Sequence, residues 1–276
     1  MSELAVQENH YTMEEIAAQL GAASKSGPTI PTLKMNYEPD DAPLGSFYLK
    51  SGSNSPVSSH VYATENVRIR AFSNHIQYQH WDDKELVNKS ILLKSQREEA
   101  RDMLGGFACG MPEFETLMAM SPEERKKYEG MDRYRVIRGL ITYTGKTIDG
   151  DEVAIENQPF KLETKRKNYG PFWHDVIKRL PNGMNLWDFE SILSIDKRKN
   201  SYGKTYYVMR FNPQFANPLP MDQMTYDSLA YVTKLVTDEN ARINQAYKEA
   251  LNIEREVGEA ATIVDKVEQA LDADVA

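Results

Sequence analysis

The sequence contains a single cysteine, Cys109, among its 276 residues. One cysteine cannot form an intramolecular disulfide, and it also excludes zinc sites built from several cysteines. No apolar run approaches the ~18–20 residues that a membrane-spanning helix needs. The first residues, MSELAVQENHY, lack the basic start and apolar centre of a secretory signal. Together these absences predict a cytoplasmic protein with no membrane association.

The motifs of common enzyme classes are also missing. Gly-Lys-Thr occurs at residues 145–147, but the flanking residues lack the spacing of a phosphate-binding P-loop. His75 and His80 fall on opposite faces of a predicted strand, so we do not expect them to bind one metal ion. Cys109 has no histidine near it in the sequence that would activate it as a nucleophile. We therefore predict no catalytic residue, no metal site and no cofactor, and a protein that is not an enzyme.

Charge is unevenly distributed along this acidic chain, whose net charge is −8. Residues 161–210 contain 11 Lys/Arg against 5 Asp/Glu, whereas residues 222–276 contain 5 Lys/Arg against 12 Asp/Glu. A basic segment in an acidic protein favours a polyanionic partner that meets one face. Two solvated surfaces of opposite sign explain the same asymmetry, so charge alone does not decide between these interpretations.

Two short basic segments share one pattern. TKRKNYGPF (164–172) and DKRKNSYGKTYY (196–207) each contain Lys-Arg-Lys, followed by Asn and a Tyr-Gly pair. Single-stranded nucleic acid is bound by aromatic rings that stack on bases and by cations that contact phosphates. Stacking does not read the base, because every base has a π-face. The pattern therefore predicts a basic-aromatic groove that binds single strands independently of sequence.

The predicted nucleic-acid-binding residues come from these two segments and from two strands. In GKTYYVMRF (203–211), alternation separates a basic-aromatic face from an apolar face, and NVRIRAF (66–72) has similar outward arginines. Each residue alone also fits an ordinary solvent face or a core anchor, so the prediction depends on their convergence. The full set is Arg68, Arg70, Lys165, Arg166, Lys167, Tyr169, Trp173, Lys197, Arg198, Lys199, Tyr202, Lys204, Tyr206 and Arg210.

The strand pattern predicts the fold. Five alternating runs are typical of half-buried strands, and one short helix, at 171–180, lies between the third and the fourth. The five runs are residues 66–81, 133–145, 152–164, 186–196 and 204–211; GSFYLKSG (45–52) and PVSSHVYA (56–63) are further strand-like runs. This order is that of an OB-fold, a small barrel that commonly binds oligonucleotides. We therefore predict a mainly β protein with added helices (α+β) and an OB-fold-like five-stranded barrel; an unrelated α+β barrel or sandwich is the alternative.

The remaining segments complete the predicted organisation. Residues 1–34 form a flexible N-terminal arm, and residues 35–215 form the nucleic-acid-binding domain. Residues 94–131 are polar and helical in character, and we interpret them as an insertion between strands. Residues 216–276 are acidic, with apolar residues at spacings near multiples of 3.5, which predicts a long C-terminal helix. Such a helix either packs on the barrel or pairs with a neighbour as a coiled coil.

Several segments resemble a group of proteins encoded by tailed bacteriophages. The resemblance covers roughly residues 29–213 and is carried by IPTLKMNYEPDD, VRIRAFSNHIQYQHWD, GGFACG, YRVIRGLITYTG and KRKNSYGKTYYVMRF. The group is that of OB-fold single-stranded DNA-binding proteins of phage replication and recombination. The resemblance implies a protein of the host cell cytoplasm that coats exposed single strands. It also implies recruitment of replication or recombination proteins through the acidic C-terminal segment.

Three questions stay open at the level of sequence. Binders of this group often end in a flexible acidic tail, whereas VEQALDADVA is predicted to be largely helical, so a homo-oligomer is an alternative use of this segment. A phage virion structural or assembly protein without nucleic-acid binding is the alternative function, because such proteins also combine a β-domain with a long helix. RNA is not excluded as a ligand, because stacking and phosphate contacts serve both nucleic acids.

Overall fold

The computed structural model describes residues 30–37, 42–51, 60–107, 109, 112 and 114–273, with the backbone alone for 114, 254 and 256–273. Most of the predicted N-terminal arm therefore lies outside the described residues. Strand β1 begins at Thr32, within the last three residues assigned to that arm. Leu33 and Met35 of this strand are buried, and their alternation ties the segment to the core.

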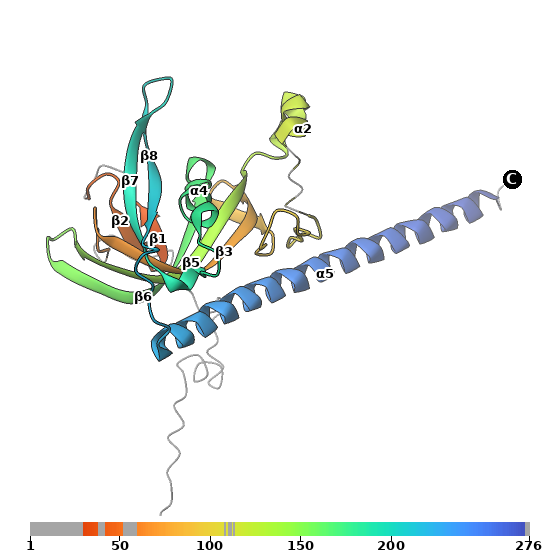
Figure 1. Ribbon diagram of the computed structural model, residues 1–276. Helices are drawn as coiled ribbons and strands as arrows, with labels where there is room; N and C mark the ends of the chain where they lie inside the picture. The colour runs from red at the N-terminus through yellow and green to blue at the C-terminus, as the bar shows by residue number, and fades with distance from the viewer. Residues whose placement is uncertain are drawn as a thin grey trace, which may run out of the picture.

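The described residues form a curled sheet of eight strands (Figure 1). The strands are β1 (Thr32–Met35), β2 (Phe47–Lys50), β3 (Val67–Asp82), β4 (Glu85–Lys89), β5 (Met131–Lys146), β6 (Glu152–Lys165), β7 (Ser191–Lys199) and β8 (Thr205–Pro213). Their order is β2-β1-β6-β5-β3-β7-β8, and β4 pairs with the end of β3. β1 and β6 run parallel, whereas the other paired strands are antiparallel. The protein is therefore mainly β with added helices, as predicted.

The predicted order of the central elements is confirmed, although the fourth predicted strand (186–196) begins only at Ser191 and its first residues form the 3-10 turn η5 (Leu186–Asp188). β3, β5, β6, helix α4 (Pro171–Asp175), β7 and β8 follow one another along the chain, with the helix between the third and fourth of these strands. The sheet has eight strands rather than the five predicted. β1 and β2 extend the sheet beyond β6, with Leu33 opposite Leu162, so the sheet is an open, curled half-barrel. β2 lies within the strand-like run 45–52, whereas β1, four residues long, was not recognised from its alternation.

The inner face of the sheet encloses the main hydrophobic core. Phe47, Phe160, Phe172 and Phe189 are fully buried there. Phe172 of α4 packs edge-to-face on Phe211 of β8, with 5.1 Å between the ring centres. Because burial of such a side chain contributes about 2–3 kcal/mol, core packing rather than helix propensity holds the short helix α4 inside the curl.

The predicted insertion lies between β4 and β5. Its helices are α2 (Phe114–Ala119) and α3 (Pro122–Lys126). Ser121 caps α3 in a reciprocal pair with Glu124, which confirms the helix start indicated by the sequence.

The first part of the insertion differs from the prediction. Residues 94–106 were expected to be helical but form turns and isolated bridges. The carboxylate of Asp102 accepts hydrogen bonds from the backbone N–H groups of Leu104 and Gly106, both at 3.0 Å. Such local side-chain bonds compete with helix formation, and here they stabilise a turn.

The predicted C-terminal helix is confirmed as α5 (Gln223–Ala273), 51 residues long. Its first half packs on the outer face of the sheet, where Val232 is buried against Phe72 and Leu140. Figure 1 shows that the rest of α5 extends beyond the body of the protein. Packing on the sheet, one of the two expected alternatives, is therefore what the structure shows for the first half.

Polar contacts fix the register of α5 on the sheet. Glu239 accepts hydrogen bonds from Lys89 Nζ (2.8 Å), Gln77 Nε2 (3.1 Å) and the guanidinium of Arg138. Asn240 accepts a bond from the backbone N of Leu92 (2.7 Å) and donates one to its carbonyl oxygen (3.1 Å). These bonds satisfy buried polar groups from both elements, so this part of α5 is an integral part of the fold.

Candidate nucleic-acid interface

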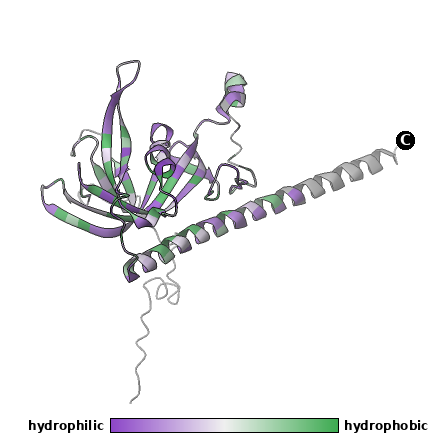
Figure 2. Cartoon of the chain, in the orientation of Figure 1, coloured by the Kyte–Doolittle hydropathy of each residue, from purple (hydrophilic) through white to green (hydrophobic). Residues whose placement is uncertain are grey.

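The second Lys-Arg-Lys run lies on the β7–β8 hairpin, which projects from the body of the protein (Figure 1). Asn200 closes the turn, because its Oδ1 accepts hydrogen bonds from the backbone N atoms of Tyr202 (3.0 Å) and Lys204 (2.9 Å). Gly203 has a φ of 74°, a conformation that favours glycine. Residues 197–199 are exposed, and Tyr202 is 87% exposed. Figure 2 shows that hydrophilic residues dominate the projecting half of this hairpin.

The first Lys-Arg-Lys run packs against the base of the same hairpin. It spans the end of β6 and the 3-10 turn η3 (Arg166–Asn168). Lys167 Nζ lies 3.6 Å from the ring centre of Tyr206 on β8, and Asn168 Oδ1 accepts a bond from the backbone N of Met209 (2.7 Å). The structure therefore joins the two runs on one surface. We call it the hairpin surface; it comprises residues 165–167, 197–199, Tyr202, Lys204 and Tyr206.

Two carboxylates pair with cations of the hairpin surface. Asp132 of β5 contacts Lys165 Nζ at 2.8 Å and the guanidinium of Arg166 at 3.1 Å. Asp196 contacts Arg198 on its own strand at 2.6 Å. Exposed ion pairs contribute only about 0–1 kcal/mol. Arg198 is therefore held in position but remains able to exchange its carboxylate for a phosphate, whereas Lys165 and Arg166 pair with a carboxylate that is only 14% exposed.

Tyr169 is engaged by two arginines of β5. The Cζ atoms of Arg133 and Arg135 lie 4.6 and 4.7 Å from its ring centre, and Arg135 Nε donates to its carbonyl oxygen at 3.0 Å. The ring is therefore better placed to orient these two guanidinium groups than to stack on a base. Arg133 is exposed and was not among the predicted residues, although the alternation in RYRVIRG places it on a face with Arg135.

Arg70 has a structural role, which corrects its assignment as a binding residue. It is only 9% exposed. Its guanidinium donates to the carbonyl oxygens of Trp187 (2.6 Å) and Pro220 (2.8 Å) and to Thr225 Oγ1 (2.9 Å). The first turns of α5 cover this part of β3, so the face predicted to be open is buried. The alternation of the sequence placed Arg70 correctly on the outer face of β3, but it did not show which element would cover that face.

Arg210 and Trp173 lie at the base of the hairpin. Asp175 of α4 accepts two hydrogen bonds from the Arg210 guanidinium (2.6 and 2.9 Å) and one from the backbone N of Phe211 (3.2 Å). Arg210 therefore ties β8 to α4, although 43% of its side chain is exposed. Trp173 on the same helix is 47% exposed, so it is not the core anchor that the alternative interpretation expected.

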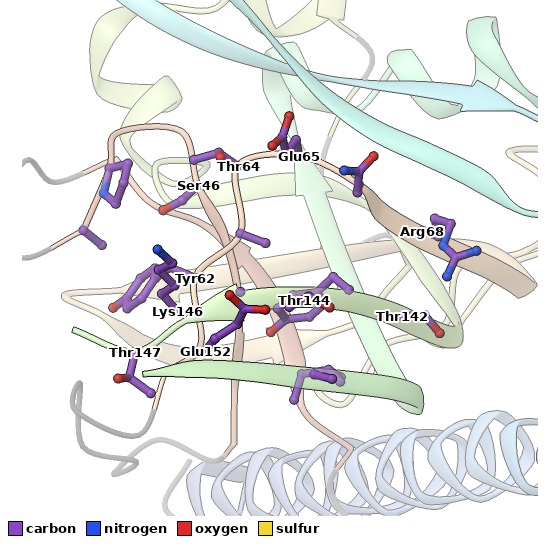
Figure 3. A pocket seen from close by; sticks show the side chains of 18 of the residues that line it. Ser46, Tyr62, Thr64, Glu65, Arg68, Thr142, Thr144, Lys146, Thr147 and Glu152 are labelled. Carbon is purple, nitrogen blue, oxygen red and sulfur yellow. The ribbon is translucent and has the colours of Figure 1, made fainter. Parts of the chain in front are cut away.

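Arg68 lies in a different place from the hairpin surface. It lines a cavity of about 990 Å³ between the β5–β6 hairpin and residues 62–68. It also pairs with Glu190 at 3.6 Å. Figure 3 shows Arg68 at one end of this cavity and Tyr62, Lys146 and Glu152 gathered at the other.

The chemistry of this cavity does not favour a polyanion. Its lining includes three glutamates, Glu65, Glu152 and Glu156, against two cations, Arg68 and Lys146. One hydroxyl of the lining already takes part in a hydrogen bond within the β5–β6 hairpin, since Thr142 Oγ1 accepts a bond from the backbone N of Asn157 at 3.0 Å. The charged side chains of the cavity are therefore net acidic, and the cavity is distinct from the basic surface.

Tyr37 is a candidate binding residue that sequence reasoning missed. It follows β1, is 57% exposed, and its hydroxyl accepts a hydrogen bond from Asn168 Nδ2 at 3.1 Å. This contact places an accessible ring directly beside the hairpin surface. The sequence around it, KMNYEPDD, carries no basic run, so only the pairing of β1 with β6 reveals its position.

The thiol of Cys109 is buried. Burial raises its pKa to about 12, so the thiol stays protonated at neutral pH. Among the residues that the structure describes, no three His, Cys, Asp or Glu lie close enough together to hold a metal ion.

The fold and surface define a mainly β protein with a curled open sheet, a projecting basic hairpin and a long C-terminal helix. No family model matches the chain, and no curated protein or solved structure matches it either. Within the described part of the chain, no helix combines the length and apolar character needed to cross a membrane.

Proposed function

We propose that the protein binds single-stranded DNA independently of sequence, through the hairpin surface. The observation that carries this proposal is the convergence of two distant Lys-Arg-Lys runs around accessible tyrosines. Lys167 lies against the ring of Tyr206, and Tyr202 projects into solvent next to residues 197–199. Cations at this spacing suit a phosphate backbone, and the rings suit unpaired bases.

We further propose that β3, β5, β6, β7 and β8 are a variant of the OB-fold. Their antiparallel pairs, β3–β5, β5–β6, β3–β7 and β7–β8, match the neighbours expected in such a barrel, and β1 occupies the edge of β6 where the barrel would otherwise close. OB-folds bind oligonucleotides with the loop after the first strand and the loop between the fourth and fifth strands. Here these loops are the insertion and the hairpin tip.

The positions of these two loops support the proposal. Figure 1 shows that α2 of the insertion and the β7–β8 hairpin project from the same end of the sheet, with α4 between them. Gln96 of the insertion donates a hydrogen bond to the hydroxyl of Tyr169 at 3.4 Å. The insertion therefore reaches the residues that support the hairpin surface.

The biological role that fits this activity is the coating of exposed single strands in phage DNA replication, recombination or repair, in the host cell cytoplasm. Recruitment of replication or recombination proteins through the acidic C-terminal segment stays a prediction. RNA fits the same chemistry and is to be compared with DNA in the same assay. A virion structural or assembly role is the outcome that failure to bind nucleic acid would support.

Replacing Tyr202 by alanine tests the stacking role directly. Loss of one stacked base is expected to weaken binding to oligo-dT about 5- to 150-fold, since each stack contributes about 1–3 kcal/mol. Because Tyr202 is almost fully exposed, the free energy of unfolding should stay unchanged. Tyr226→Ala is the matched control, because Tyr226 is 55% exposed on α5. Equal affinities of the two variants in fluorescence anisotropy would contradict the role of Tyr202.

We also propose that the free end of α5 assembles copies of this chain. Leu251 and Ile253 are exposed where the helix leaves the body. Beyond them Val257, Val264 and Leu271 recur every seven residues, the spacing of a coiled coil. A helix end of this kind is marginal in water without a partner.

A chain ending at residue 251 tests this assembly. It keeps the contacts of α5 with the sheet and should have the mass of one chain in light scattering, whereas the full chain should have a multiple of that mass. Equal masses for the two would show that the end of α5 does not assemble the protein.

A further inference from the structure

A row of lysines crosses the outer face of strands β2, β1 and β6. Thr32 of β1 pairs with Lys50 of β2 on one side and with Lys161 of β6 on the other. Residues paired in this way point to the same face of a sheet, and neighbouring strands lie about 4.8 Å apart. The backbones of Lys50 and Lys161 are therefore about 10 Å apart across Thr32.

Lys34 adds a third ammonium group to this face. It lies two residues after Thr32, on the side opposite the buried Leu33 and Met35. Burial lowers its pKa, and the charges of Lys161, Lys50 and Lys165 lower it further, whereas Glu163 raises it. Lys34 is therefore close enough to the other three lysines to be repelled by each of them. Glu163, at 3.1 Å from Lys161, is the carboxylate among them.

Protection of a sheet edge does not explain this row. Lysines on edge strands commonly prevent pairing with other chains, and β2 is such an edge. Lys34 and Lys161, however, lie on β1 and β6, which have neighbours on both sides. Like charges gathered on inner strands destabilise the fold unless a bound anion neutralises them.

The row is continuous with the hairpin surface. Lys165, which interacts electrostatically with Lys34, belongs to that surface and is followed directly by Arg166 and Lys167. Tyr37 stands at the junction, next to β1 and bonded to Asn168 of η3. A chain of cations therefore runs from β2 to the β7–β8 hairpin, with an exposed ring part of the way along.

We propose that the bound DNA strand continues from the hairpin surface over this face, with its phosphates on Lys165, Lys34, Lys161 and Lys50. This inference rests on the proposed function and adds a second segment to its binding site. A short oligonucleotide is expected to occupy the hairpin surface alone, whereas a longer one also reaches the lysine row.

The test compares two lengths of oligo-dT on a variant that lacks the row, Lys34→Ala/Lys50→Ala/Lys161→Ala. For an oligonucleotide of about 20 nucleotides, the slope of log affinity against log salt should fall by up to ~2, at ~0.7 per lost phosphate contact. For one of about 6 nucleotides, near the small end of OB-fold site sizes, affinity should stay within about twofold of the unsubstituted protein.

A matched variant controls for the loss of three charges. Lys234→Ala/Arg242→Ala/Lys248→Ala removes three exposed cations of α5 and should leave both lengths unaffected. If the unsubstituted protein binds neither oligonucleotide, the proposed function itself is wrong. If it binds both and the lysine-row variant keeps the full salt slope on the longer one, only the extension is wrong. An equal loss at both lengths also overturns the extension, because it would place these lysines in the first segment of the site.

Discussion

Simultaneous replacement of Lys197, Arg198 and Lys199 by alanine is expected to weaken binding to oligo-dT about 10- to 150-fold, at roughly 0.5–1 kcal/mol per exposed charge contact. The slope of log affinity against log salt should also fall by up to ~2. These residues lie at the end of a projecting hairpin and are exposed, so their substitution leaves the core untouched. Fluorescence anisotropy at several salt concentrations measures both quantities.

The α5 variant Lys234→Ala/Arg242→Ala/Lys248→Ala is the matched control, because it removes two lysines and one arginine from an exposed helix face. It changes the net charge of the protein by the same amount without touching the hairpin. A hairpin variant that binds as tightly, and with the same salt slope, as this control would exclude residues 197–199 from the binding site.

Replacement of Glu239 by alanine is expected to lower the free energy of unfolding by about 3–5 kcal/mol. The side chain of Arg138 is 5% exposed and pairs with Glu239, so the substitution leaves a buried guanidinium without its counter-charge. Lys89 and Gln77 lose the same acceptor. Urea denaturation measures the effect. Glu249→Ala, on an exposed position of the same helix, should change the free energy by less than about 0.5 kcal/mol.

The pH dependence of stability is a second test of the ion pairs that Glu239 makes with Arg138 and Lys89. Burial opposes the charged form of Glu239, but Lys89 and Arg138 outweigh it and lower its pKa to about 2 from 4.5. The charged carboxylate therefore stabilises the fold above about pH 4.5, by about 3 kcal/mol, and this contribution is lost as the pH falls toward 2. Glu239→Gln should have a shallower loss of stability across that window. If the free energy of unfolding fell equally in the two proteins between about pH 4.5 and 2, the role of the ion pair would be contradicted.

Local patterns in the sequence predicted the elements of the fold well. Strands β3, β5, β6, β7 and β8 are at least nine residues long and contain alternating runs, and the start of α3 carries a complete capping box. Features that depend on distant partners were not predictable in this way. β1 is recognisable only through its pairing with β6 and β2, whereas the run 45–52 already indicated β2. The turn at 94–106 depends on the hydrogen bonds of a single carboxylate, Asp102.

In the candidate site, too, local patterns were predictable and contacts between distant residues were not. Composition identified the Lys-Arg-Lys runs, and the fold brings them together through Lys167 and Tyr206. Strand alternation placed Arg70 correctly on the outer face, but nothing in the sequence showed that α5 covers it. The lysine row is invisible in the sequence for the reverse reason, because Lys34, Lys50 and Lys161 become neighbours only when the three strands pair.

The most direct test of the central claim is a titration of labelled oligo-dT with the full chain, at low and high salt and in the presence of duplex competitor. The account predicts tight binding at low salt, a steep loss of affinity as salt rises, and no displacement by duplex, because stacking requires unpaired bases. Absence of binding at low salt, or equal displacement by duplex, would contradict the assignment of the hairpin surface as a site for single strands.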